Sequence, residues 1–341
     1  MSRLFFWRRK NRTQPDPAAA LAVTAIVEQP VRQPVAVQPV QRLVYALALH
    51  SPRAADPAAQ PEASQKEVVL AARQAVDQVG TEPRYTPRRP SLLPQLMEVV
   101  NDEEASLRAL SRMVMQDPRL TGEMLRVANS ALYRVSPTPV ESIERAAALL
   151  GTRGIRMLIS GVLIQPLAHS GAGSDRFGNL IWDHSSYSSA AADAWAARSG
   201  EAEPFAAQML ALLHGLGVVT VYRVLMDIYA TQPDLTPDAA AIAIALESDA
   251  PIAASRIARS WGLSERTQQA LEANVAAAAG AEPSPLTRAL QFGLLAGGLT
   301  LLCRHGRLTE FDAQDQLEAA GFQGPVAARV WERLLRAYVR P

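Results

Sequence analysis

The chain has 341 residues, 48% hydrophobic and 20% charged, which is the composition of an ordinary globular protein with a sizeable core. Its net charge of +1 hides an asymmetry, because residues 1–90 carry 13 Lys and Arg against 7 Asp and Glu, whereas residues 91–341 carry 21 against 26. A basic segment joined to an acidic body argues against a nucleic-acid-binding globular surface, since phosphate contacts need clustered cations there.

The single cysteine and the lengths of the apolar runs indicate the cellular compartment in which the protein is located. Cys303 cannot form an internal disulfide, which favours a reducing environment. The apolar run Leu4–Trp7 is too short for a secretory signal, and the later runs are interrupted by Arg156, Arg288 and Gln291 before they reach 18 residues. We therefore expect a cytoplasmic protein without a membrane-spanning helix.

Proline dominates the start of the chain, where the first 90 residues contain 11 of the 24 prolines. Frequent proline removes backbone donors and favours extended chain, which buries too little surface to offset its ordering entropy. The pattern predicts that residues 1–88 are mostly disordered. It allows at most one short helix, at 64–79, which would be marginal on its own.

The first residues combine aromatic and basic side chains, "FFWRRK", outside any expected core. Such a cluster can lie on an anionic membrane surface, or it can be the incidental end of a disordered tail. Both interpretations stay open. The residues are Phe5, Phe6, Trp7, Arg8, Arg9 and Lys10.

From Leu92 onward the apolar residues recur at three and four positions, as in Leu107, Leu110 and Val114, which is the spacing of one helix face. Asp117 before Pro118 is typical of a helix N-cap, and Gly151 is typical of a helix end. No alternating run with hairpin turns is present. The sequence predicts an all-α fold of roughly a dozen helices.

Several segments together resemble the HDOD family, the HD-related output domains of bacterial signalling proteins. The segments are "LLPQLMEVVND", "MVMQDPRLTGEMLRVANSALY", "SIERAAALLG", "RGIRMLISGVL", "IWDHSSYSSAAADAWA" and "FAAQMLALLHGLGVV". The resemblance implies a multi-helix HD-like bundle. We expect it to span residues 89–305, followed by a helical C-terminal extension, 306–341, that packs on the domain.

The HDOD family is similar to the HD phosphohydrolases, and this resemblance implies four metal ligands: a histidine, a His-Asp doublet and a later aspartate. His184 matches the first histidine and His214 the histidine of the doublet, but Gly215 stands where the doublet has its aspartate. Gly297 stands in the expected place of the later aspartate, with a shift of one residue in either direction left open by the two adjacent glycines. Both carboxylates, which would offset the cation's charge and orient a metal-bound water, are therefore missing.

Without those carboxylates we expect no metal, no cofactor and no hydrolysis. We interpret the chain as a non-catalytic signalling or regulatory protein that binds other proteins of a bacterial pathway. Two alternatives remain: a residual metal-dependent phosphohydrolase, and a nucleotide sensor that uses the vestigial pocket. The candidate pocket residues are His184, His214, Arg153 and Arg156, although both histidines can also serve only packing.

Overall fold

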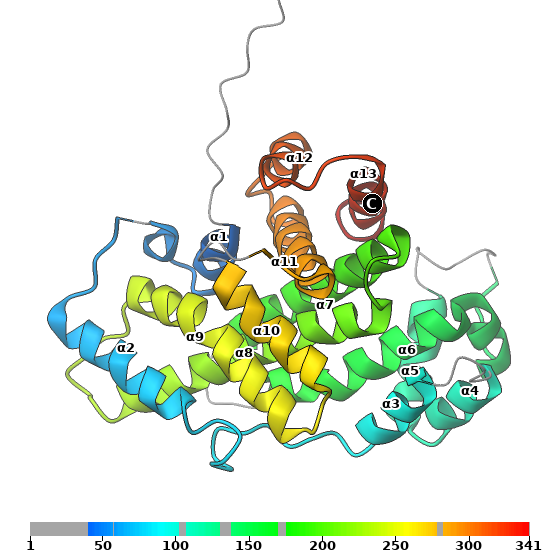
Figure 1. Cartoon of the computed structure of the whole chain (residues 1–341), viewed down its shortest axis with the longest axis horizontal. Coiled ribbons are helices and arrows are strands. Elements are labelled where there is room, and N and C mark those ends of the chain that lie inside the picture. Colours follow the sequence, from blue (N-terminus) through cyan, green and yellow to red (C-terminus); the bar gives the residue numbers. More distant parts are fainter. Residues whose placement is uncertain are drawn as a thin grey trace, which may run out of the picture. The chain divides into compact units, whose positions relative to one another are not determined.

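The computed structural model describes residues 40–56, 58–101, 107–129, 138–169, 175–277 and 282–340 (Figure 1). Within these ranges the chain forms helices and no strand, so the predicted all-α class is confirmed. The helices belong to a unit of residues 37–341, separate from residues 1–36. They are α1 (Val40–Ala48), α2 (Ala63–Val76), α3 (Leu93–Asn101), α4 (Leu107–Met115), α5 (Pro118–Ala128), α6 (Ile143–His169), α7 (Asp175–Ser199), α8 (Pro204–Ala230), α9 (Ala239–Ser260), α10 (Glu265–Ala277), α11 (Pro285–Arg304), α12 (Glu310–Ala319) and α13 (Pro325–Leu334), with a short 3₁₀ helix η1 (Pro52–Ala55) and a π-helical segment η2 (Leu335–Val339).

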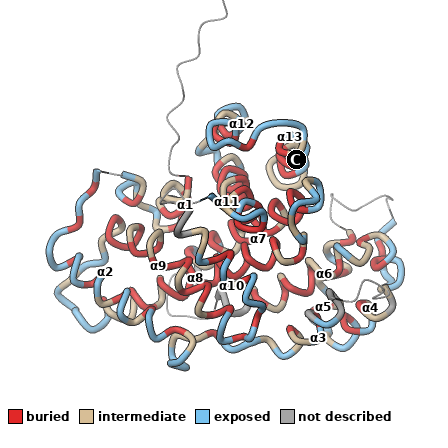
Figure 2. Tube along the Cα trace, viewed as in Figure 1, coloured by how far each residue is buried: buried red, intermediate tan, exposed pale blue. Residues whose placement is uncertain are grey.

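The core is built around three long helices, α7, α8 and α11. Helix α7 packs against α11 and against α8, and α8 packs in turn against α9, α2 and α6. Helix α8 is apolar on every side and buried along most of its length, as expected for a helix enclosed by others (Figure 2). Helix α7 therefore has α8 and α11 as its principal neighbours, and it carries His184.

The local signals in the sequence are confirmed where the structure describes them. The Asp117 carboxylate accepts hydrogen bonds from two backbone N–H groups in the first turn of α5, and Pro118 occupies the first helical position. Gly151 interrupts α6 with φ 64° and ψ 177°, a left-handed conformation that favours glycine. The Asn129 side chain ends α5 and bonds both the N–H and the C=O of Val140, beyond the following loop.

The expectation of at most one short helix before residue 88 is wrong for residues 40–88. Helix α2 matches the expected helix at 64–79, but α1 and η1 also form. Isolated short helices are marginal, and here burial stabilises them: Val44 and Tyr45 of α1 are 0% and 1% exposed, and Val68 of α2 is 0% exposed. Residues 1–39, including the aromatic and basic cluster at 5–10, lie outside the described ranges.

Three of the described helical segments are long and apolar enough to cross a bilayer, judged by length and composition alone: Ile143–Gln165, α8 and α11. In α8 and α11, 83% of the apolar window is buried against the rest of the protein. The interior of the bundle thus accounts for the composition of these two helices. A cytoplasmic location stays a prediction.

Candidate functional site

The structure brings His184 and His214 together inside the bundle. His184 lies on α7 and His214 on α8, with 1% and 4% of their surface exposed. The His184 Nε2 atom lies 3.2 Å from the carbonyl oxygen of Leu294 on α11, so this imidazole spans the contact between α7 and α11. The first two positions implied by the family resemblance are therefore adjacent in space.

Both imidazoles are held neutral at pH 7. Burial lowers the pKa of His184 to about 4, partly opposed by its hydrogen bond to Leu294. Burial and, to a lesser extent, the neighbouring His184 together lower the pKa of His214 to about 3. The Nδ1 atom of His214 has no hydrogen-bond partner among the described residues, an unsatisfied buried polar atom of the kind that costs about 1–3 kcal/mol.

Gly215, at the doublet's missing carboxylate, has no space for a side chain. A Cβ atom built there would overlap Ser185 Oγ and would lie 2.8 Å from Ser185 Cβ. Ser185 is itself fixed, because its hydroxyl donates a 2.7 Å hydrogen bond to the carbonyl of Ile181 one turn earlier in α7. The close approach of α7 and α8 therefore occupies the position that an aspartate would need.

The later carboxylate position needs a correction of one residue. A Cβ atom at Gly297 would collide with the backbone of Ser188, whereas a Cβ atom at Gly298 would lie 3.6 Å from His184 Nε2. Gly298, not Gly297, therefore faces the histidines. The same Cβ would lie 2.8 Å from Val40 Cγ1 and 3.3 Å from Val44 Cγ2, so α1 fills the space beside it.

A divalent metal does not fit this interior. Two imidazoles are present, both carboxylate positions are glycines, and the space beside these glycines is taken by Ser185 and by Val40 and Val44. Across the described ranges, no group of three or more His, Cys, Asp or Glu side chains is placed to hold a metal ion. These residues make an interior packing contact rather than a coordination site.

The structure does not bring Arg153 to the histidines. Arg153 forms an ion pair with Asp193, which lies nine positions after His184 on α7. At 1.5 Å and 100° per residue, that spacing is about 13 Å along the axis and about 180° around it. Arg156 is half-buried on α6, where its carbonyl accepts a hydrogen bond from Ser160. Arg153 therefore does not join His184 and His214 in the four-residue pocket expected from the sequence.

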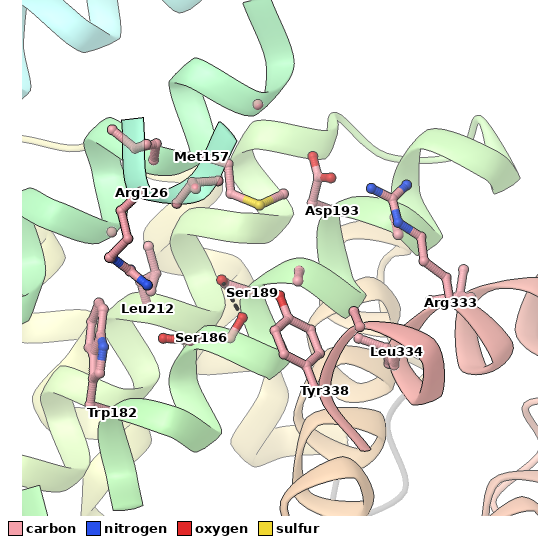
Figure 3. Close-up of a pocket in the computed structure, with 18 residues that line it drawn as sticks. Arg126, Met157, Trp182, Ser186, Ser189, Asp193, Leu212, Arg333, Leu334 and Tyr338 are labelled. Atoms are coloured by element: carbon pink, nitrogen blue, oxygen red, sulfur yellow. Dashed lines mark hydrogen bonds between the residues drawn. The ribbon is translucent and has the colours of Figure 1, made fainter. Parts of the chain in front are cut away.

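A separate groove lies on the opposite face of α7, with a cavity of about 350 Å³ (Figure 3). Trp182, Ser186, Ser189 and Asp193 line it from α7 at spacings of four, three and four residues, which place them on one stripe of the helix. Arg126 and Trp182 lie at one end of the groove in Figure 3, and Asp193 and Arg333 lie at the other. Helices α5, α6, α8 and α13 and segment η2 complete the wall.

Asp193 is a buried acidic side chain on the wall of this groove. Its side chain is 4% exposed, and burial raises the pKa of its carboxyl. The charge of Glu203 also raises this pKa. The bonded Arg153 and the charge of Arg333 act in the opposite direction and lower it, without cancelling the effect of burial. A buried carboxylate is thus held on the groove wall between cations from α6 and α13.

Sequence reasoning missed this groove. Trp182 is half-buried and lines the cavity. A signal was present, because Ser186, Ser189 and Asp193 form a polar stripe along a helix that is otherwise rich in alanine. Arg333 gave no comparable signal, since its proximity to Asp193 depends on how the C-terminal helices fold back onto α7.

Comparisons with known proteins agree with this architecture. The HDOD domain profile matches residues 86–276, more than half of the chain. An HDOD domain protein of unknown function from Geobacter sulfurreducens is similar in structure, with 18% identity and a TM-score of 0.54 over 81% of this chain and 99% of that one. A proposed metal-dependent phosphohydrolase from Shewanella amazonensis SB2B has 16% identity and a TM-score of 0.54 over 81% and 100% of the two chains.

A proposed signal transduction protein from Marinobacter aquaeolei VT8 has 16% identity and a TM-score of 0.52, over 80% of this chain and 63% of its own. At these identities the solved structures establish the fold alone. A search of curated proteins returned no match. The sequence profile and the shared fold lead to one conclusion: this chain belongs to the HDOD family.

Proposed function

We propose that this chain is a non-catalytic regulatory protein of a bacterial signalling pathway, located in the cytoplasm, which acts by binding other proteins through its HDOD domain. The observation that carries the proposal is the closed interior at His184 and His214. Both positions expected to supply carboxylates are glycines, and Ser185, Val40 and Val44 occupy the adjoining space. A hydrolase of the HD type needs a metal and a water in that volume.

Two further observations support binding over catalysis. Both imidazoles are neutral at pH 7, and among the described residues no carboxylate raises the pKa of either one, as the acid of an acid–base pair would. The similar Marinobacter protein is described as a proposed signal transduction protein. The description of the Shewanella protein as a metal-dependent phosphohydrolase favours the alternative, but the packing around Gly215 and Gly298 opposes its transfer to this chain.

The alternative of nucleotide sensing in the vestigial pocket has less support. Val40 and Val44 of α1 fill the space beside Gly298, and Arg153 is committed to Asp193 on the opposite face of α7. A nucleotide phosphate in that interior would meet two imidazoles that burial holds neutral.

Reconstitution with a purified partner tests the proposal. Partners would be crosslinked and captured from the native bacterium, identified by mass spectrometry, expressed separately, and mixed with the full chain for light scattering and calorimetry. The same preparation would be assayed with Mn²⁺ and a phosphodiester substrate. We expect a stoichiometric complex and no metal-dependent turnover.

The matched control is Ser185→Ala, which enlarges the interior at Gly215 without touching the surface. It should bind the partner as the wild type does. Metal-dependent turnover that rises in this variant would contradict the proposal. Failure of every captured protein to re-form a complex with the purified chain would contradict it as well.

A further inference from the structure

Arg333 lines the groove beside α7 without a fixed partner. Within the part of the chain that the structure describes, no hydrogen bond or ion pair engages its guanidinium. Arg126, at the other end of the groove, differs because Glu123 binds it at 2.6 Å on the same helix. The two arginines therefore differ: Glu123 binds Arg126 directly, whereas Arg333 interacts with Asp193 through its charge without a direct ion pair.

The surroundings of Arg333 carry an excess of positive charge. Arg153 and Arg333 act on Asp193, and burial together with the charges of Arg333, Arg153 and Arg329 lowers the pKa of Arg198. Four guanidiniums, those of Arg153, Arg198, Arg329 and Arg333, thus interact in this region, and the carboxylates that act on the same groups are those of Asp193 and Glu203.

Glu203 is also engaged elsewhere, since its carboxylate caps α8 by accepting from two backbone N–H groups. An anion placed beside Arg333 would relieve the repulsion that this cluster now carries. Arginine is well suited to such an anion, because its planar fork of N–H donors matches the oxygens of a phosphate.

The rest of the groove is apolar or aromatic. Met157, Leu158 and Leu212 are among its apolar lining residues. The Trp182 indole lies at the end away from Arg333 (Figure 3). The hydroxyl-bearing residues Ser186 and Ser189 lie between the two ends (Figure 3). The cavity of about 350 Å³ falls within the range of about 300–1,000 Å³ typical of small-molecule pockets.

We propose that this groove binds a small organic phosphate, with its phosphate at Arg333 and a planar aromatic body over Met157 and Leu212 toward Trp182. The inference goes beyond the proposed function, because it gives the module a small-molecule input on the face of α7 opposite the histidines. Helix α13 and segment η2, which supply Arg333, Leu334 and Tyr338, lie beyond the residues matched by the family profile. The ligand would bridge these C-terminal segments to α7.

Calorimetry on the full chain tests the proposal with adenosine monophosphate as the probe, since it joins a planar ring to a phosphate. Adenosine and inorganic phosphate serve as its two fragments. We expect the monophosphate to bind more tightly than either fragment, because only the intact probe reaches both ends of the groove.

Three variants assign the binding to the groove. Arg333→Gln removes a charged hydrogen-bond donor and should weaken binding about 10- to 100-fold. Gly161→Leu should abolish binding, because Gly161 lines the groove and a Cβ there meets only Trp182, at 4.0 Å, so the larger side chain extends into the cavity. Arg336→Gln is the matched control on the next turn: Arg336 pairs with Glu332, does not line the groove, and should leave affinity unchanged. Circular dichroism would establish that each variant is folded.

Two outcomes of the calorimetry with the monophosphate would overturn the proposal. One is the absence of binding heat from the monophosphate at millimolar concentration with folded wild-type protein. The other is binding that Arg333→Gln and Gly161→Leu both leave intact. A phosphorylated peptide that binds where the monophosphate does not would also overturn it, identifying the groove as a protein-docking site. The proposed function fails by a different result, metal-dependent turnover.

Discussion

The two faces of α7 differ in space and in charge. On one face His184 is buried against α11, and Ser185 fills the volume next to Gly215. On the other face Asp193 and Arg333 border a cavity of about 350 Å³. The family resemblance directs attention to the first face, but the second has the room and the charged side chains that a ligand needs.

Gly215 and Gly161, one on each side of α7, differ in the space available for a side chain. At Gly215 a Cβ atom would overlap Ser185, whereas at Gly161 its nearest neighbour would be Trp182 at 4.0 Å. Glycine at the first position permits the close approach of two helices. At the second, no steric constraint requires it. The chain thus combines the HDOD fold with close packing beside Gly215 and Gly298, where Ser185, Val40 and Val44 occupy the space.

The largest expected effect comes from deleting residues 1–88, which removes α1 and its contact with the histidine face. Fully burying one valine-sized side chain contributes about 1.5–3 kcal/mol, and Val44, Val68 and Val76 are each at most 1% exposed. We expect a loss of more than about 5 kcal/mol in the free energy of unfolding, comparable to the whole stability of many domains. Urea denaturation followed by circular dichroism measures it.

The control is a shorter deletion, of residues 1–36 only. It stops before the unit that begins at Val37 and keeps every described helix. Its unfolding midpoint should match that of the full chain. An unchanged midpoint after deletion of residues 1–88 would show that α1 and α2 do not stabilise the core.

Gly215→Asp is the next largest effect. The new side chain must displace Ser185, and overpacking of this kind costs about 1–3 kcal/mol before the cost of burying a carboxylate is added. We expect a total cost of about 3 kcal/mol or more and no metal-dependent turnover. The same substitution at Gly161, which faces the groove, should cost less than about 1 kcal/mol. Equal losses of stability for Gly215→Asp and Gly161→Asp, measured by thermal unfolding, would contradict the difference in packing between the two faces of α7.

Stability should fall as the pH falls through the window set by the two histidines. Their pKa values in the folded chain, about 4 for His184 and about 3 for His214, lie below the value of about 6.5 expected in the unfolded chain. The unfolded chain therefore binds more protons below pH 6.5, and the contribution present at pH 7.5 is lost on acidification. At 1.36 kcal/mol per pH unit, the loss by pH 5 is about 2 kcal/mol for each histidine.

The double variant His184→Leu with His214→Leu removes the contribution of the two histidines to the pH dependence of stability. In buffer containing EDTA, its stability should differ from the wild type by no more than about 1–2 kcal/mol at pH 7.5, because both polar groups leave together. Its stability should also decline less between pH 7.5 and pH 5. Parallel pH profiles for the two proteins would contradict the assignment of neutral buried imidazoles.

Gly161→Ala is the smallest effect and has the opposite sign. The added Cβ has room, and alanine loses less backbone entropy than glycine inside a helix. We expect a gain of about 0.5–1 kcal/mol in the free energy of unfolding. A loss of stability would show that the groove face at Gly161 is as tightly packed as the interior.

Much of the fold could be predicted from the sequence, because helix periodicity and end signals such as Asp117 and Gly151 act locally. The positions of His184, His214 and Gly215 followed from the family resemblance. The filling of that interior could not be predicted, since it depends on the distance between α7 and α8 and on a helix in the proline-rich segment. Helix α1 is too short to be stable alone, and only its burial against α7, α9 and α11 accounts for it.

The groove could be predicted only in part. The polar stripe from Ser186 to Asp193 is visible in the sequence, and it indicates a helix face that is not fully buried. Arg333, which also lines the groove, lies 140 residues from Asp193 along the chain, and no local pattern relates the two. The one-residue correction from Gly297 to Gly298 has a similar cause, because the rotation of α11 about its axis is set by packing.

The most direct test of the closed-interior account is the metal content of the folded wild-type chain. The protein would be incubated with Mn²⁺, Fe²⁺, Ni²⁺ or Zn²⁺, desalted and analysed by mass spectrometry, with the His184→Leu, His214→Leu double variant in parallel. We predict that both proteins retain far less than one ion per chain and that neither hydrolyses a phosphodiester. One ion per wild-type chain, lost together with hydrolysis in the double variant, would contradict the account.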